Sequence, residues 1–172
     1  SKVHRASMLS VIRIDKPSEY KSFFNANHLD GFVQSSFGYG LVDSSGELVC
    51  AMIFRQAMHD NCLEISRFCT KSGHKVHGGF SKLMSEFPAN KPLISYSSNR
   101  ISTGHTYSSC GFSPRESSSY LSYYYTDGSV RLFRTKCQKR CLPPEYLSLG
   151  LTERQYAEGG YFAEVLLGRK VP

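Results

Sequence analysis

The sequence predicts an α/β domain, and two stretches of the chain carry that prediction. Residues 37–42 and 48–54 are apolar segments separated by the turn Asp43-Ser44-Ser45-Gly46, which is typical of a β-hairpin. Further along, the patterns of a strand, a glycine turn, a helix and a strand follow one another, at 62–69, 78–79, 80–87 and 93–96. This alternation indicates a βαβ unit.

Length and composition favour one globular unit. The chain has 172 residues, 40% of them hydrophobic, which suffices for one substantial core. We therefore expect a single domain over 1–172, with 142–172 as a C-terminal extension packed on it. The apolar runs are too short to span a bilayer, and Lys2, His4, Arg5 and Arg13 interrupt the N-terminal one. An intracellular protein without a membrane partner is expected.

The elements before the βαβ unit follow from local patterns. Residues 7–14 are β-branched and apolar enough for a first strand. Ser18 is expected to cap a short helix that ends near Asn27-His28, and Tyr20, Phe23 and Phe24 recur there at helical spacing. That helix should turn its aromatic face inward.

In the βαβ unit, residues alternate along the strand at 62–69, with Leu63, Ile65 and Arg67 expected on one face. Between this strand and Gly78-Gly79 we expect a polar loop. The helix at 80–87 has its apolar residues at i, i+3, i+4 and i+7, namely Phe80, Leu83, Met84 and Phe87. A further short helix is expected at 102–110, with Gly111 as its C-terminal stop.

The last third predicts a second hairpin and one more helix. Strands are expected at 120–125 and 130–135 around the turn Thr126-Asp127-Gly128-Ser129. The run Tyr123-Tyr124-Tyr125 fits either strand packing or a platform for stacking bases. Thr152 and Gln155 form the pattern of a capping box that opens a short helix. The final dozen residues are expected to form a strand or an arm.

The six cysteines are spread along the chain, without the dense spacing of a disulfide-rich secreted scaffold, so reduced thiols are expected. A zinc site drawn from Cys62, Cys69, His74 and His77 stays an alternative, although its spacing matches no compact Cys-x-x-Cys pattern. We predict no metal.

The formal charge of +7 favours an anionic partner, such as nucleic acid, a phosphorylated cofactor or an acidic surface. The alternative is a merely basic, soluble surface. Cations gather in two segments: Lys71, His74, Lys75, His77 and Lys82 in one, and Arg131, Arg134, Lys136, Lys139 and Arg140 in the other. The second segment is the candidate nucleic-acid-binding stripe.

The turn Gly78-Gly79 before the helix at 80–87 is the arrangement that aims unpaired backbone N–H groups at an anion. Ser81 and Lys82 would add a hydroxyl and a charge. The alternative is an ordinary β-to-α turn.

This order of elements resembles the GCN5-related N-acetyltransferase family. The resemblance includes the strand Leu63–Phe68, the glycine turn, and Tyr107 placed four residues before Gly111-Phe112. More narrowly, the chain resembles a phage-encoded, homing-endonuclease-associated family with an acyltransferase-like domain, through the following segments: Asn27-His28-Leu29-Asp30-Gly31, Arg67-Phe68-Cys69, Val76-His77-Gly78-Gly79-Phe80-Ser81-Lys82-Leu83, Ser95-Tyr96-Ser97-Ser98-Asn99-Arg100 and Gln138-Lys139. The resemblance implies a fold with a mainly antiparallel central sheet flanked by helices. It also implies that the protein is located in the host cytoplasm.

The resemblance also implies a cofactor and roles for residues. An acyl-CoA, such as acetyl-CoA, would be held by the segment Lys75, Val76, His77, Gly78, Gly79, Phe80, Ser81 and Lys82. Tyr107 would protonate the departing thiolate and Glu64 would act as general base. Apart from the resemblance, the polar residues His28 and Arg67 are candidates to face the substrate. Alternatively, Tyr107 is a core aromatic and Glu64 a structural partner of Arg67 or Lys82, and capping or an ion pair explains His28 and Arg67. The family has a small residue at the position of Phe80, so its ring is expected to hinder close approach of the backbone to a pyrophosphate.

Three functions remain open at this stage. The first is an acyl-CoA-dependent N-acyltransferase acting on an amine, plausibly in DNA or another nucleic acid. The second is an inactive module of the same fold that binds nucleic acid through the stripe Arg131–Arg140. The third is a protein-interaction domain without a ligand.

Overall fold

The computed structural model describes residues 1–58, 61–97, 103–115, 125–126, 131–132 and 134–167. Its contacts divide the chain into two compact units, Ser1–Arg115 and Glu116–Pro172. Each unit is described by itself.

The first unit is built on a five-stranded sheet in the order β2-β3-β4-β5-β7. All neighbours in this sheet are antiparallel except β5 and β7, which are parallel. Its strands are β2 (Ser10–Ile14), β3 (Phe37–Val42), β4 (Leu48–Gln56), β5 (Leu63–Thr70) and β7 (Leu93–Ser95). Its helices are α1 (Lys21–Asn27), α2 (Gly79–Ser85) and α3 (His105–Ser108), and two 3-10 turns, η1 (Ala6–Met8) and η2 (Pro17–Tyr20), lie near the start of the chain. A mixed α/β fold with a mostly antiparallel sheet is therefore confirmed.

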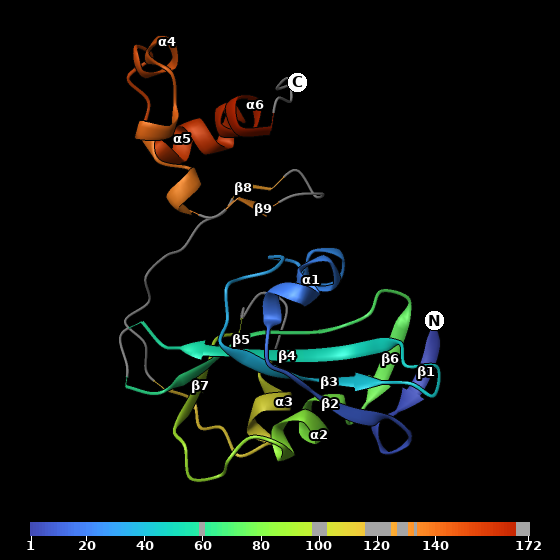
Figure 1. Ribbon diagram of the computed structural model, residues 1–172. Coiled ribbons are helices and arrows are strands. Elements are labelled where there is room, and N and C mark those ends of the chain that lie inside the picture. Colours follow the sequence, from blue (N-terminus) through green and yellow to red (C-terminus); the bar gives the residue numbers. More distant parts are fainter. Residues whose placement is uncertain (59–60, 98–102, 116–124, 127–130, 133, 168–172) are drawn as a thin grey trace. The chain divides into compact units, whose positions relative to one another are not determined.

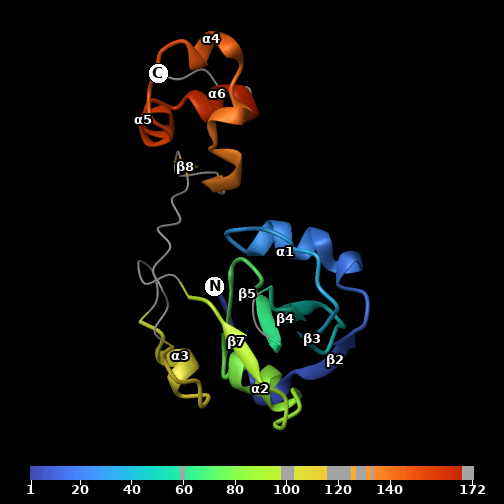
Figure 2. The same cartoon turned by 90° about the vertical axis from the view of Figure 1, so that its left-hand side faces the viewer.

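Helices cover both faces of this sheet, α1 on one side and α2 with α3 on the other (Figures 1 and 2). The larger core lies on the α2 side and includes Leu41, Phe54 and Leu83, all fully buried. The smaller core lies under α1, around Phe24 and Ile53. The inward aromatic face of α1 is confirmed. Ser18, however, does not cap this helix, because it lies inside η2, and the N-cap residue Tyr20 makes no side-chain capping bond.

The β3–β4 hairpin is confirmed, and its turn has a clear local cause. The Asp43 carboxylate accepts hydrogen bonds from the backbone N–H groups of Ser45 and Glu47, at 2.9 and 3.1 Å. Gly46 adopts a φ of 82°, a left-handed conformation that glycine tolerates without strain. Short polar side chains and one glycine thus suffice to reverse the chain.

The βαβ unit is confirmed as β5, α2 and β7, with Leu63 opposite Leu93 in the parallel register. Its helix buries Phe80, Leu83 and Phe87, as their spacing predicted. The short helix before Gly111 also forms, but over fewer residues, since α3 covers only His105–Ser108. The start of its predicted range at residue 102 lies outside the described residues.

A β-bulge changes which face of β5 each residue occupies. Arg67 lies opposite Ile53 and Ile65 lies opposite Phe54, so Ser66 is an extra residue in the ladder. Ile65 and Phe68 consequently both join the α2-side core. The expectation that Arg67 shares a face with Leu63 and Ile65 is therefore wrong, because strict alternation ends at the bulge.

A second, two-stranded sheet pairs β1 (Lys2–Arg5) with β6 (His74–His77) in parallel. The two strands lie side by side at one end of the unit (Figure 1). Neither strand was expected, and β6 replaces part of a predicted polar loop. Its stability comes from a pairing across about 70 positions of sequence, so local propensity carries no signal for it.

The second unit contains β8 (Tyr125–Thr126), β9 (Arg131–Leu132), the 3-10 turns η3 (Arg134–Lys136) and η4 (Lys139–Cys141), and helices α4 (Pro144–Leu147), α5 (Glu153–Glu158) and α6 (Tyr161–Leu167). Its core consists of Cys137, Leu142, Tyr156 and Phe162. Residues on both sides of position 142 contribute to this core. The contacts of the described residues therefore show no boundary at the start of the predicted extension 142–172.

Two expectations for this unit are corrected and one is confirmed. The capping box of α5 forms as predicted, with Thr152 accepting from the N–H of Gln155 and the Gln155 side chain accepting from the N–H of Thr152. The last described residues form helix α6 rather than a strand or an arm. The second hairpin exists as the antiparallel pair β8–β9, but Arg134–Lys136 is a 3-10 turn instead of strand. Residues 120–124 and 127–130 of that prediction, with Tyr123 and Tyr124, lie outside the described residues.

Across the described part of the chain, no helix is long and apolar enough to cross a membrane. All six cysteines are free thiols.

Candidate functional site

The glycine turn forms at the start of α2, with Gly78 as its N-cap residue. Gly78 has a φ of 75°, where a larger residue would be strained. No side chain caps this end of the helix, so the first-turn N–H groups of Gly79, Phe80 and Ser81 lack the partners that a helix interior supplies. Gly79 has a packing role instead, because a Cβ there would lie 3.0 Å from Val76 Cγ1 and 3.3 Å from Cys50 Sγ.

Phe80 does not lie over this turn, contrary to expectation. Its side chain points into the α2-side core and is 5% exposed. The ring centroid lies 5.1 Å from that of Phe68 and 5.2 Å from that of Tyr107, both edge-on. The ring is therefore part of the core. Of the first three residues of α2, Gly79 and Phe80 are buried and Ser81 is exposed.

The spacing between Tyr107 and Gly111-Phe112 has a structural cause. The N–H of Phe112 donates to the carbonyl of Tyr107 at 3.1 Å, and the N–H of Gly111 donates to that of Ser108 at 3.1 Å. With Gly111 at a φ of 84°, these bonds form a Schellman motif, which commonly brings two apolar side chains together. The rings of Tyr107 and Phe112 do pack, at 5.6 Å. The motif alone thus accounts for the spacing of these three residues in this chain, and the catalytic role of Tyr107 stays a prediction.

The cations of the predicted cofactor segment have different environments. The ammonium of Lys82 donates to the carbonyls of Ala6 and Leu9 at 2.8 and 2.6 Å. Lys75 and His77 are exposed on β6, whereas Val76 between them packs against the core. Lys82 therefore joins α2 to η1.

Glu64 is nearly buried and forms an ion pair with Arg55 on the adjacent strand, with 2.9 Å between Arg55 Nη2 and Glu64 Oε1. The structural partners expected for Glu64 were Arg67 and Lys82, whereas the structure pairs it with Arg55. Because its neighbours Leu63 and Ile65 face the α2-side core, strand alternation places Glu64 on the opposite face from Tyr107. The fold does not bring the two predicted catalytic side chains together.

Arg67 and His28 both stabilise the loop that follows α1. Arg67 donates from Nε to the Gly31 carbonyl and from Nη1 to the Ser66 carbonyl, each at 2.7 Å. The Nδ1 atom of His28 accepts a hydrogen bond from the N–H of Asp30 at 3.0 Å. These contacts with backbone groups are structural, but they are neither the capping nor the ion pair that was expected as the alternative, and a substrate contact stays a prediction.

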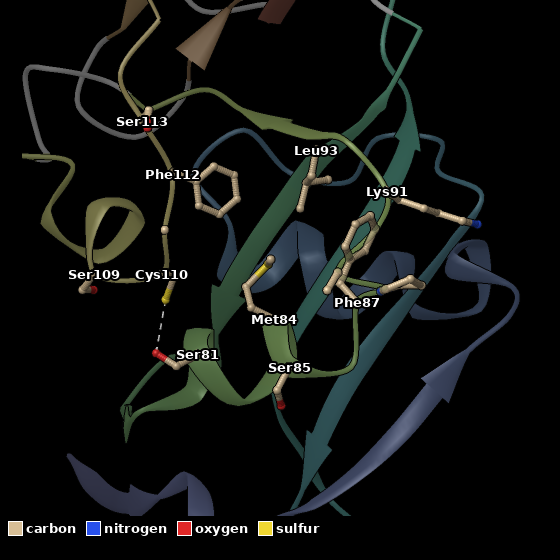
Figure 3. A pocket seen from close by; sticks show the side chains of 13 residues that line it. Ser81, Met84, Ser85, Phe87, Lys91, Leu93, Ser109, Cys110, Phe112 and Ser113 are labelled. Atoms are coloured by element: carbon tan, nitrogen blue, oxygen red, sulfur yellow. Dashed lines mark hydrogen bonds between the residues drawn. The ribbon is translucent and has the colours of Figure 1, made fainter.

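A groove of about 740 Å³ lies beside α2, between this helix and the segment Ser109–Ser113 (Figure 3). Met84, Phe87, Leu93 and Phe112 give it an apolar lining. The Oγ of Ser81 and the Sγ of Cys110 lie 3.3 Å apart and connect its two walls. Of the predicted site residues whose side chains the structure describes, Ser81 alone lines the groove.

Sequence reasoning missed most of the groove residues because their apolar spacing predicts only a buried helix face. The second wall, Ser109–Ser113, could not be located from the sequence. It includes the Schellman motif after α3, and its position depends on how α3 packs in the tertiary structure.

In the second unit, Arg134, Lys136, Lys139 and Arg140 are all exposed, on η3 and η4. Buried Cys137 lies between the two pairs and anchors the segment in the core. The side chain of Arg131 lies outside the described part. The structure thus brings four of the five predicted cations to the surface of one short segment.

Within the described ranges, no group of three or more His, Cys, Asp or Glu side chains is arranged to hold a metal ion. Comparison with known proteins adds no relative, since no family model, curated protein or solved structure matches the chain.

Proposed function

We propose that this chain is an acyl-CoA-dependent N-acyltransferase whose acceptor is an amine, plausibly one within nucleic acid. The observation that carries the proposal is the uncapped turn at Gly78, with its unpaired amides next to an apolar-lined groove along the same helix. Unpaired N–H groups at a helix start attract phosphate, and small-molecule sites have volumes of about 300–1,000 Å³.

The residues present fit such a cofactor. In the proposal a pyrophosphate approaches the first turn of α2 at Ser81, the exposed residue of that turn, whose side chain also lines the groove. Met84, Phe87 and Phe112 offer apolar contacts for an extended thiol arm. Lys82 is left out of the proposed phosphate contacts, because the carbonyls of Ala6 and Leu9 occupy its ammonium.

The cofactor would supply an acyl group activated as a thioester. In the proposal Tyr107, at the edge of the aromatic cluster with Phe80, provides the proton for the departing thiolate. Glu64 contributes as a base only where its Arg55 pair opens, so direct attack by an already neutral amine is the simpler route. In that route the carbon–nitrogen bond forms, the carbon–sulfur bond breaks, and the proton that the nitrogen loses passes to water. This reaction would place the protein inside a cell, where acyl-CoA occurs.

The test is the thermal stability of the protein with and without acetyl-CoA. A ligand at 100 times its Kd stabilises the folded state by about 2.7 kcal/mol, which raises Tm. Ser81→Asp should abolish this rise, because a carboxylate in the first turn of α2 repels phosphate while favouring the helix dipole. Ser81→Ala is the matched control and should keep it. An unchanged Tm at millimolar acetyl-CoA would contradict the proposal.

A second candidate function is nucleic-acid binding without catalysis, favoured by the exposed cations Arg134, Lys136, Lys139 and Arg140. It predicts salt-dependent DNA binding that Lys139→Ala with Arg140→Ala weakens, in a protein that acetyl-CoA does not stabilise. DNA binding that is insensitive to salt would count against it.

A further inference from the structure

The small β1–β6 sheet has one exposed face. Its register places Val3 beside Lys75 and Arg5 beside His77, and all four residues are exposed. The residues that alternate with them point the other way, where His4, His74 and Val76 are half-buried. Pairing β1 with β6 therefore brings Arg5, from the start of the chain, to two basic residues, Lys75 and His77, more than 65 positions later in sequence.

The basic side chains of this region differ in whether they form ion pairs or hydrogen bonds with other described residues. Lys71 pairs with Glu47, and Lys2 pairs with Asp43. His74 shares a hydrogen bond of 3.0 Å with His4, and Lys82 is bound by backbone carbonyls. None of the ion pairs found among the described residues includes Arg5, Lys75 or His77.

The shape of this face favours an extended polyanion over an enclosed ligand. Arg5, Lys75 and His77 do not line the groove beside α2. Side chains two residues apart on one face of a strand are about 7 Å apart, and neighbouring strands are about 5 Å apart. Cations with these separations can contact successive phosphates of one chain, and Val3, 59% exposed, adds apolar surface beside them.

We propose that the exposed β1–β6 face binds the phosphate backbone of a nucleic acid through Arg5, Lys75 and His77. This inference goes beyond the proposed function, because it needs neither the glycine turn nor acyl-CoA. It also places a nucleic-acid contact in the first unit, whereas the stripe Arg134–Arg140 belongs to the second.

The experiment measures binding of the full chain to fluorescently labelled single-stranded and duplex oligonucleotides by anisotropy, between 50 and about 200 mM salt. Arg5→Ala with Lys75→Ala should weaken binding at least tenfold at the lower salt concentration. For single strands, the slope of log K against log salt should fall in magnitude by about 1.4, since each lost phosphate contact removes about 0.7. Lys16→Ala with Lys21→Ala removes the same charge from exposed positions at and before α1, and should weaken binding much less.

Three results would overturn the inference: no binding of either oligonucleotide, equal losses in the two double variants, or a loss confined to Lys139→Ala with Arg140→Ala. Acetyl-CoA is absent from these measurements, so their outcome is independent of the thermal test of the acyltransferase proposal.

Discussion

The ammonium of Lys82 donates a hydrogen bond to the carbonyl oxygen of Ala6, at 2.8 Å, across 76 positions of sequence. A second bond to the Leu9 carbonyl, at 2.6 Å, completes the contact. The residue that sequence reasoning assigned to a cofactor phosphate thus stabilises the link between the N-terminal segment and α2.

Replacing Lys82 by Met should lower the free energy of unfolding by about 2–3 kcal/mol, because two carbonyls lose a charged donor. Urea denaturation measures this loss. Lys75→Met is the matched control, since that side chain is exposed on the same segment, and its effect should stay within about 0.5 kcal/mol. Equal effects of the two substitutions would contradict the structural role of Lys82.

The pairing of β1 with β6 should weaken in acid. His4 and His74 stack at 5.1 Å between ring centroids, and desolvation together with the charge of His4 lowers the pKa of His74 below its usual 6.5. Lys2 and Lys71 act in the same direction and Glu47 opposes them. A base whose folded-state pKa is depressed contributes stability that is present above pH 6.5 and is lost as pH falls through the folded-state value.

Tm should therefore fall between pH 7.5 and pH 5, and hydrogen exchange of the β1 amides should quicken. In the variant His74→Phe, which keeps a stacked ring but cannot be protonated, the part of this pH dependence that is due to His74 should be missing. The same acid sensitivity in the variant would show that other groups cause it.

The ion pair between Arg55 and Glu64 gives a test of the general-base assignment. Glu64→Gln should cost about 1–2 kcal/mol of stability, less than a fully buried pair because Arg55 is about one-third exposed. Urea denaturation measures it, and Arg55→Met with Glu64→Met should recover part of the loss. If the folded Glu64→Gln protein keeps full transfer activity, Glu64 is structural, whereas a rate lower by tenfold or more in that folded protein would restore its catalytic role.

The cysteines should differ in reactivity according to burial. Burial raises the pKa of the Cys50 thiol to about 11 and that of Cys69 to about 12, so neither forms appreciable thiolate at pH 8. Iodoacetamide at that pH should modify Cys62, Cys110 and Cys141 first, as these are partly exposed. Mass analysis of peptides measures the order, with urea-unfolded protein as the control in which all six react. Early modification of Cys50 in folded protein would contradict its burial.

Local chemistry in the sequence was enough to predict several elements. The Asp43–Gly46 turn, the buried face of α2 and the Thr152–Gln155 capping box each depend on residues within about two helical turns of one another, so their cause is visible in the sequence. The order strand, helix, strand likewise predicted the parallel pair of β5 and β7.

Tertiary structure decided the features on which the site depends. The bulge at Ser66 arises from pairing with β4 and sends Arg67 to the loop after α1, and the β1–β6 pairing places Arg5 beside His77. The helical spacing predicted that Phe80 is buried, but its partners Phe68 and Tyr107 were known only from the tertiary structure. In each case the deciding partner lies about 10 to 70 positions away, and burial and hydrogen bonding between such distant residues leave no periodic pattern in the sequence itself. The glycine turn was thus predictable from sequence, but the side chains around it were not.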